Sequence, residues 1–255
     1  MMQVKNLSFH YKGCPEVLKD VSFDMEPGQF LAILGNNGVG KSTLLKCFNH
    51  ILKPDSGVVC LDGENLLKQS SREVAKKVAF VSQSVPSTQM TVHDVVMLGR
   101  RPYMKWGFTE EDHNIVHDAM HRLDVEDMRG RFLNQLSGGE KRRLYLLKVL
   151  MEAPNVLILD EPTAVLTPQE TEKLFKILKH MKEKGCNVII ITHKLNEVMA
   201  LSDRVSVLRK GEYIGTVETK DTDENKLTEM MVGKKIELNI ERSEPENPTP
   251  RLVVH

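Results

Sequence analysis

The nine residues Gly35–Thr43, with the sequence Gly-Asn-Asn-Gly-Val-Gly-Lys-Ser-Thr, constrain the fold of this chain more than any other stretch. An apolar run, Phe30–Leu34, precedes them and is typical of a buried strand, and a helix is predicted over Leu44–Leu52. Strand, glycine loop and helix in this order are the context in which G-x-x-x-x-G-K-[ST] predicts a phosphate-binding loop. The alternative is a chance match in a Gly-rich turn.

Each residue type in the loop suits an anion. Gly35, Gly38 and Gly40 let the backbone curl so that its N–H groups point inward. A helix beginning near Lys41 adds unsatisfied N–H groups and a partial positive charge. Lys41 is expected to reach the β and γ phosphates of a nucleotide, and the hydroxyl of Ser42 to bind Mg²⁺.

A second motif lies more than a hundred residues downstream. The apolar run Val156–Leu159 predicts a buried parallel strand, which ends in the carboxylates of Asp160 and Glu161. Proteins with α/β folds bind ligands at this end of their strands. Asp160 is therefore expected to hold Mg²⁺ beside the phosphate loop, and Glu161 to polarise a water molecule. The alternative is a solvated strand end.

Charge and cysteine usage exclude several classes of function. The 255 residues include 35 basic and 35 acidic side chains, which gives no electrostatic case for a nucleic-acid partner. The four cysteines form no C-x-x-C pair and are expected to be reduced thiols of a cytosolic protein. No apolar run is long enough to span a membrane, so any role at a membrane requires a partner protein.

The middle of the chain differs in character from the motifs on either side. A short strand ends at Gln83, and residues 84–151 show helical patterns over 91–98 and 110–123 without a convincing strand. We therefore expect a helical subdomain inserted into an α/β core.

Within that segment, Leu136–Glu140 opens a helix that is predicted over Lys141–Met151. Ser137 and Glu140 fit a capping box, S-x-x-E, which is by itself a sufficient explanation. Gly138 and Gly139 are costly just inside a helix, however, and this indicates that some group approaches the backbone closely.

The C-terminal part returns to an alternating pattern. Thr167–Glu170 is a helix start, with a cap, a proline and a glutamate, and Gly185 ends that helix. A buried strand follows over 187–192, and His193 stands at its end. A lone histidine is usually structural.

These elements predict an α/β fold with a P-loop NTPase (RecA-like) core, an N-terminal antiparallel β subdomain and an inserted α-helical subdomain. The expected organisation is one domain over 1–240, with a core of 1–83 and 152–222, a helical subdomain of 84–151, a C-terminal helix region of 223–240 and a linker-like tail of 241–255.

Taken together, these motifs resemble the nucleotide-binding subunit of an ABC transporter over about residues 2–235. Gly35–Thr43 matches the Walker A motif, and Val156–Asp160 matches the Walker B strand with Glu161 in the general-base position. Leu136–Glu140 matches the signature motif, which normally ends in Gln. His193 matches the switch histidine.

Two single residues extend the resemblance. Gln83 matches the Q-loop glutamine, and Tyr11 matches the aromatic residue that stacks on adenine. From spacing alone, Tyr11 is equally well explained as a strand residue that packs on a sheet.

The resemblance implies a mechanism in which two copies of the chain pair head to tail and enclose two ATP molecules. Its ATP-binding residues here are Tyr11, Gly35, Asn36, Asn37, Gly38, Val39, Gly40, Lys41, Ser42, Thr43, Ser137, Gly138 and Gly139, of which the last three serve the partner's nucleotide. It assigns Glu161, His193 and Gln83 to catalysis, and Ser42, Gln83 and Asp160 to Mg²⁺.

Three departures from the family pattern stand out. Glu140 replaces the usual Gln, the stretch 141–148 is bulkier than the Ala-rich helix common there, and Ala164–Thr167 lacks the D-loop aspartate. The last departure puts communication between two ATP sites in doubt.

The two halves resemble different branches of the family, so the sequence looks mosaic, whether by recombination or by engineering. Residues 1–150, especially 91–106, resemble ATPases of iron-chelate and cobalamin importers, and 155–255 resemble the first half of tandem sugar or nucleoside importer ATPases.

The resemblance implies the motor subunit of an importer for a metal chelate or a cobalamin-like cargo. It would be cytoplasmic and peripheral on the inner face of the membrane, through transmembrane permease subunits. The alternatives are a sugar or nucleoside importer ATPase, a soluble or uncoupled ATPase without a transport role, and a simple P-loop kinase, in which Leu136–Glu140 and His193 have no task.

Overall fold

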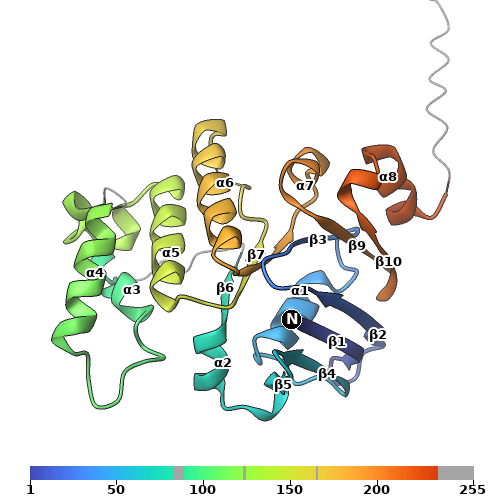
Figure 1. Cartoon of the computed structure of the whole chain (residues 1–255), viewed down its shortest axis with the longest axis horizontal. Coiled ribbons are helices and arrows are strands. Elements are labelled where there is room, and N and C mark those ends of the chain that lie inside the picture. Colours follow the sequence, from blue (N-terminus) through green and yellow to red (C-terminus); the bar gives the residue numbers. More distant parts are fainter. Residues whose placement is uncertain (83–88, 123–124, 165, 235–255) are drawn as a thin grey trace, which may run out of the picture.

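The computed structural model describes residues 1–82, 89–122, 125–164 and 166–234 (Figure 1). The strands are β1 (Met2–His10), β2 (Glu16–Met25), β3 (Phe30–Leu34), β4 (Ser56–Leu61), β5 (Glu64–Asn65), β6 (Val78–Val81), β7 (Val156–Asp160), β8 (Asn187–Ile191), β9 (Arg204–Arg209) and β10 (Glu212–Glu218). The helices are α1 (Lys41–Phe48), α2 (Ser71–Lys77), α3 (Val92–Leu98), α4 (Glu110–Arg122), α5 (Gly138–Glu152), α6 (Pro168–Glu183), α7 (Leu195–Leu201) and α8 (Glu224–Val232).

All these strands form one mixed sheet in the order β5-β4-β1-β2-β10-β9-β3-β8-β7-β6. The run β9-β3-β8-β7-β6 is parallel from strand to strand, whereas β9 pairs with β10 in antiparallel fashion. Strands β3, β7 and β8 are buried throughout. Both faces of this parallel part are covered, since Leu31 and Ile33 pack in the cluster that contains α1, and Phe30, Ala32 and Leu34 pack in the one that contains α6.

The N-terminal strands form the antiparallel part of the sheet. Strand β1 pairs with both β2 and β4, so that Val4 lies opposite Phe23 on one side and Val59 on the other. Strand β2 meets β10 at a single parallel pair, Lys19 and Glu212. The predicted α/β architecture with an N-terminal antiparallel β part is confirmed.

Helices α3, α4 and α5 lie to one side of the sheet (Figure 1) and enclose a cluster of their own. Val116 and Met120 of α4 are fully buried there in one cluster with Leu147 of α5. In the described residues between β6 and β7, the one strand-like contact is a bridge between Thr91 and Phe132. This agrees with the helical character predicted for the segment.

The positions at which the helices begin and end depend more on backbone conformation and capping hydrogen bonds than on the pattern of apolar residues. The helix predicted to continue to Leu52 ends at Phe48, because His50 takes a left-handed conformation with φ 61°. The predicted start of α6 is confirmed, with the Thr167 hydroxyl accepting the Glu170 N–H at 3.3 Å. Helix α5 begins at Gly138, earlier than Lys141, so the paired glycines lie in its first turn.

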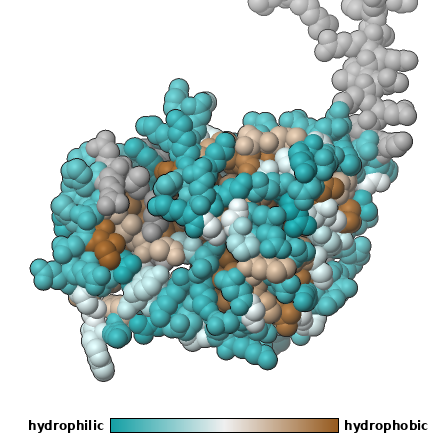
Figure 2. Space-filling model, viewed as in Figure 1, coloured by the Kyte–Doolittle hydropathy of each residue, from teal (hydrophilic) through white to brown (hydrophobic). Residues whose placement is uncertain are grey.

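The face shown in Figure 2 is mostly hydrophilic, and its apolar atoms form small separate patches. Within the described ranges, no helix has both the length and the apolarity needed to cross a membrane. All four cysteines are free thiols, as expected.

Candidate nucleotide site

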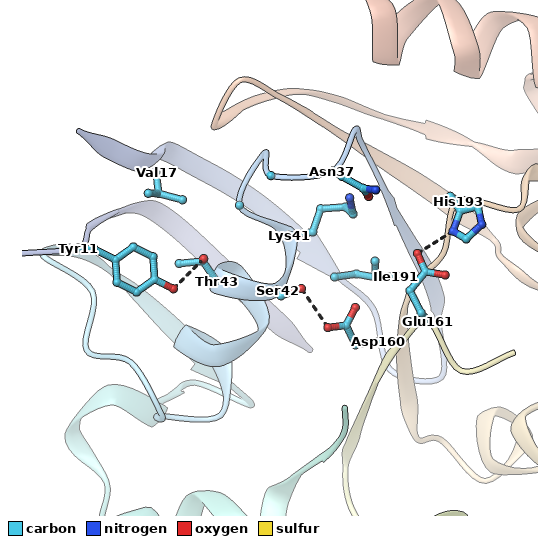
Figure 3. Close-up of a pocket in the computed structure, with 12 residues that line it drawn as sticks. Tyr11, Val17, Asn37, Lys41, Ser42, Thr43, Asp160, Glu161, Ile191 and His193 are labelled. Atoms are coloured by element: carbon cyan, nitrogen blue, oxygen red, sulfur yellow. Dashed lines mark hydrogen bonds and ion pairs between the residues drawn. The ribbon is translucent and has the colours of Figure 1, made fainter. Parts of the chain in front are cut away.

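The carboxyl ends of β3, β7 and β8 lie side by side, because β8 separates β3 from β7 in the sheet. The loops that follow these strands meet at a cavity of about 470 Å³ (Figure 3). Its lining consists of Tyr11, Val17, Asn37, Gly38, Gly40, Lys41, Ser42, Thr43, Asp160, Glu161, Ile191 and His193. Residues predicted from separate motifs are therefore brought to one place.

The glycines of the loop carry the backbone turn that the sequence predicts. Gly35, Gly38 and Gly40 have φ values of 153°, 81° and 101°. A Cβ at Gly40 would lie 2.9 Å from Cδ2 of Leu18 and 3.0 Å from the carbonyl oxygen of Val17. Position 40 therefore requires glycine for both its conformation and its contact with β2.

Lys41 lies in the first turn of α1, and its ammonium is enclosed by the loop. It donates to the carbonyl oxygens of Gly35 at 2.7 Å and Asn36 at 2.9 Å. Burial lowers the pKa of Lys41, and the nearby carboxylates of Glu161 and Asp160 oppose that shift. A desolvated cation in this position attracts phosphate oxygens more strongly than one in water.

Ser42 and Asp160 join the two predicted motifs directly. The Ser42 hydroxyl on α1 donates to Oδ2 of Asp160, at the end of β7, over 3.0 Å (Figure 3). A hydroxyl and a carboxylate are the hard oxygen ligands that Mg²⁺ prefers, so this pair fits the predicted metal role. The third predicted ligand, Gln83, lies outside the described residues. The part of the chain that the structure describes holds no group of three or more His, Cys, Asp or Glu suited to a metal.

Glu161 and His193 form the second polar pair at the cavity. Oε1 of Glu161 lies 2.9 Å from Nδ1 of His193, and the Glu161 side chain is only 12% exposed against 66% for His193. Glu161 has a left-handed backbone with φ 47°, and its N–H donates to the carbonyl oxygen of Ile191 at 2.9 Å. Strained conformations of this kind cluster at active sites.

Tyr11 follows β1 directly and lies at the wall of the cavity. Its hydroxyl bonds to Oγ1 of Thr43 at 3.1 Å, and its ring meets the Phe9 ring edge to face at 4.9 Å between centroids. The side chain is 39% exposed. The packing interpretation from the sequence thus has support in the Phe9 contact, and stacking on adenine stays a prediction.

Ser137, Gly138 and Gly139 do not line this cavity. They form the N-terminus of α5, where Ser137 Oγ accepts the Glu140 N–H at 3.2 Å and Glu140 Oε2 accepts the Ser137 N–H at 2.7 Å. These bonds, together with Arg131, hold the pKa of Glu140 below its ordinary value. The predicted capping box is confirmed, and Glu140 completes it as well as a glutamine could.

Gly139 also has a close neighbour within its own chain. A Cβ at Gly139 would overlap the carboxylate of Glu170, which the Thr167 capping box holds in the first turn of α6. The close approach expected from the paired glycines is therefore present, and at position 139 it is made by Glu170. Contact of Gly139 with a partner's nucleotide stays a prediction.

A charge at position 139 should separate these two explanations. We expect Gly139→Asp to abolish ATP-dependent dimerisation, because a carboxylate would face the partner's γ-phosphate, while ATP still binds each monomer. Light scattering in the hydrolysis-deficient Glu161→Gln background measures this. Glu170→Ala, combined with Gly139→Asp, removes the clash inside the chain. Recovery of the dimer in that double variant would contradict a role of Gly139 at the nucleotide.

Two residues that line the cavity, Val17 and Ile191, are not predicted from the sequence. Val17 on β2 comes 24 positions before Lys41, and the sheet and the Gly40 contact bring it to the loop. Ile191 is the last residue of β8, two positions before His193. Its position at the end of a parallel strand is the feature of the sequence that could have predicted its place at the cavity.

Comparison with known proteins identifies the family. The ABC transporter family model matches residues 18–164. The chain is 37% identical over 212 residues to the uncharacterized ABC transporter ATP-binding protein MJ0089 of Methanocaldococcus jannaschii, covering 83% of each protein. It is 38% identical over 248 residues to the ribose import ATP-binding protein RbsA of Corynebacterium glutamicum, covering 95% of this chain. The chain spans only 47% of that relative's length.

Two further comparisons cover most of both proteins. The chain is 32% identical over 216 residues to the petrobactin import ATP-binding protein YclP of Bacillus subtilis, covering 84% of this chain and 85% of that one. The dimeric structure of the ATP-binding cassette MJ0796 in a post-hydrolysis state, bound to ADP and Pi, superposes with a TM-score of 0.76 at 26% identity. That superposition covers 86% of this chain and 99% of the other.

The family match covers more than half of the chain, and the fold and the motifs at the cavity agree with it. The predicted relationship to ABC transporter ATP-binding subunits is confirmed, and its relatives include proteins named for petrobactin import and for ribose import. The chain belongs to the ABC transporter family, as an ATP-binding cassette of the kind that hydrolyses ATP.

Proposed function

We propose that the chain is the ATP-hydrolysing motor subunit of an ABC importer that takes up a metal chelate or a cobalamin-like cargo through separate membrane subunits. The observation that carries the proposal is the meeting of Lys41, Asp160 and Glu161 at one cavity, from the ends of two strands. The petrobactin relative, matched over most of its length, supports the cargo class. The ribose relative favours a sugar as the second candidate, with the chain matching half of a longer protein.

In this proposal the loop binds the phosphates of ATP, and the chain stabilises the charge that develops during hydrolysis. Lys41 and the N–H groups at the start of α1 face the phosphate oxygens. Ser42 and Asp160 would hold Mg²⁺, which when bound neutralises phosphate charge. Glu161 takes a proton from the water that attacks the γ-phosphorus, as the bond to ADP breaks. His193 holds the Glu161 carboxylate in position.

A second copy of the chain would complete the site. Ser137, Gly138 and Gly139 lie outside the cavity of their own chain, so they reach a γ-phosphate only across a head-to-tail dimer. The dimeric state named for the MJ0796 cassette supports this arrangement. The N-terminus of α5 would then add a second helix end to the phosphate.

The surface for the membrane subunits is proposed within the segment 84–108, of which the structure describes 89–108. Trp106 is fully exposed there and Phe108 is partly exposed, beside a hollow lined by Tyr103 and Lys105. An exposed tryptophan is the residue type that most often anchors an interface. Through these subunits the chain would lie on the inner face of the cell membrane.

Purification of the native complex tests the proposal, since identification of the membrane subunits that accompany the chain distinguishes a metal-chelate importer from a sugar importer. We expect Trp106→Ala to reduce their recovery about tenfold or more, as loss of an interface anchor does, with ATP hydrolysis by the isolated chain unchanged. Ile51→Ala, which truncates another exposed apolar side chain, is the control. Equal recovery with Trp106→Ala would remove this residue from the docking surface.

A further inference from the structure

Next to the Glu161–His193 pair lies a polar cluster that consists of three buried residues, Thr163, Thr192 and Glu197, and the partly exposed Lys194. Glu197, in the first turn of α7, is 5% exposed. Its two carboxylate oxygens lie 2.7 Å and 2.9 Å from the Thr163 hydroxyl, and the Thr192 hydroxyl donates to Oε2 at 3.3 Å. Glu197 thereby joins the loop after β7 to the loop after β8.

Lys194 neutralises this carboxylate and adds further bonds between the same loops. Its ammonium forms an ion pair with Oε1 of Glu197 at 3.1 Å and donates to the hydroxyl and carbonyl oxygens of Thr163 at 3.1 Å and 3.3 Å. A buried acid that is both paired and hydrogen-bonded in this way is costly to disturb, since a lost partner leaves the other group unsatisfied.

Three residues of the cluster are close neighbours of the Glu161–His193 pair in sequence. Thr163 comes two residues after Glu161, and Thr192 and Lys194 flank His193. The left-handed backbone of Glu161 requires a surrounding structure that enforces it. None of the four cluster residues lines the nucleotide cavity, so the cluster has no direct contact to offer ATP.

We propose that Glu197 is a positioning residue for hydrolysis, which fixes the loops after β7 and β8 so that the Glu161 carboxylate stays aligned with the attacking water and with His193. This inference rests on the proposed role of Glu161 as the base. The competing explanation is that the cluster stabilises the fold without affecting the chemistry.

The two explanations differ in which kinetic constant changes. We expect Glu197→Gln to lower kcat about 10–100-fold, the cost of a misplacement near 1 Å, with little change in KM for ATP, because the phosphate loop is untouched. Thr163→Val, a milder change that removes one hydroxyl, should lower kcat in the same selective way.

Asp203→Asn is the control. Asp203 pairs with Lys182 at 2.6 Å and accepts the Phe30 N–H at 2.8 Å, at the far end of β3 from the site, and kcat should be unchanged.

A double-mutant cycle gives the decisive readout. If Glu197 acts through Glu161, then Glu197→Gln should slow the residual hydrolysis of Glu161→Gln by less than about twofold, because the step it aligns is already lost. Two results would overturn the positioning role. One is a double variant whose rate is reduced by the product of the two single reductions, and the other is a normal kcat for both Glu197→Gln and Thr163→Val. Normal turnover in Glu161→Gln alone would instead overturn the proposed base, so the two failures are distinguishable.

Discussion

Replacing Glu161 with glutamine should slow ATP hydrolysis by about 10²–10⁴-fold, the usual contribution of a general base, while ATP binding is retained. Glutamine has nearly the same size and can keep the contact with Nδ1 of His193, but it cannot take a proton from water. Phosphate release measures the turnover, and titration calorimetry measures the binding of ATP.

The same variant should accumulate as a dimer when ATP is added, because binding continues and the step that ends the bound state is blocked. Glu218→Gln, at the exposed end of β10, is a suitable control and should behave as the unmodified chain. Near-normal turnover in Glu161→Gln would remove Glu161 from the role of base.

Replacing Lys41 with alanine should remove most ATP binding. The loss of a buried cation that faces an anion costs about 2–5 kcal/mol, which corresponds to a rise in Kd of roughly 30-fold or more. Binding of a fluorescent ATP analogue measures the change. Lys46→Ala, in the last turn of the same helix α1, is the matched control. An unchanged Kd for Lys41→Ala would contradict the phosphate-binding assignment of the loop.

The stability of Lys41→Ala should not fall together with its affinity for ATP. Burial lowers the pKa of Lys41, so the folded state disfavours the charged ammonium, and this penalty is fully present below the folded pKa. The penalty decreases as pH rises above the folded pKa and is absent above the ordinary pKa of lysine, 10.5. Thermal unfolding at neutral pH should therefore show no loss of stability in the variant.

The parts of the site that the sequence predicts are those encoded by consecutive residues. The phosphate loop, the two carboxylates after β7 and the histidine after β8 each follow an apolar run, and parallel strands bring such ends to one edge. Even there the backbone adds something unforeseen, since nothing in the local pattern indicates the left-handed conformation of Glu161.

Local sequence patterns do not predict contacts between segments that are far apart in the chain. The overlap between Gly139 and Glu170, and the bonds from Glu197 to Thr163, connect residues more than thirty positions apart. The helix predicted to reach Leu52 is a case in which the local pattern is misleading. Its apolar residues continue beyond Phe48, but the left-handed conformation of His50 ends the helix there. Predictions for Gln83 and for the tail 241–255 fall outside the described residues.

The strand order has a consequence for the way in which the first and second halves of the chain combine. Strand β3, from the first half, lies between β9 and β8, and β6 lies against β7, so the halves are interleaved within one sheet. They meet there through main-chain hydrogen bonds and aliphatic packing, and also through the Asp203 side chain, which accepts the Phe30 N–H. Ser42 and Asp160 connect the halves at the site. Neither half could therefore form the candidate site alone, because the phosphate loop belongs to the first half and the Asp160 and Glu161 carboxylates belong to the second.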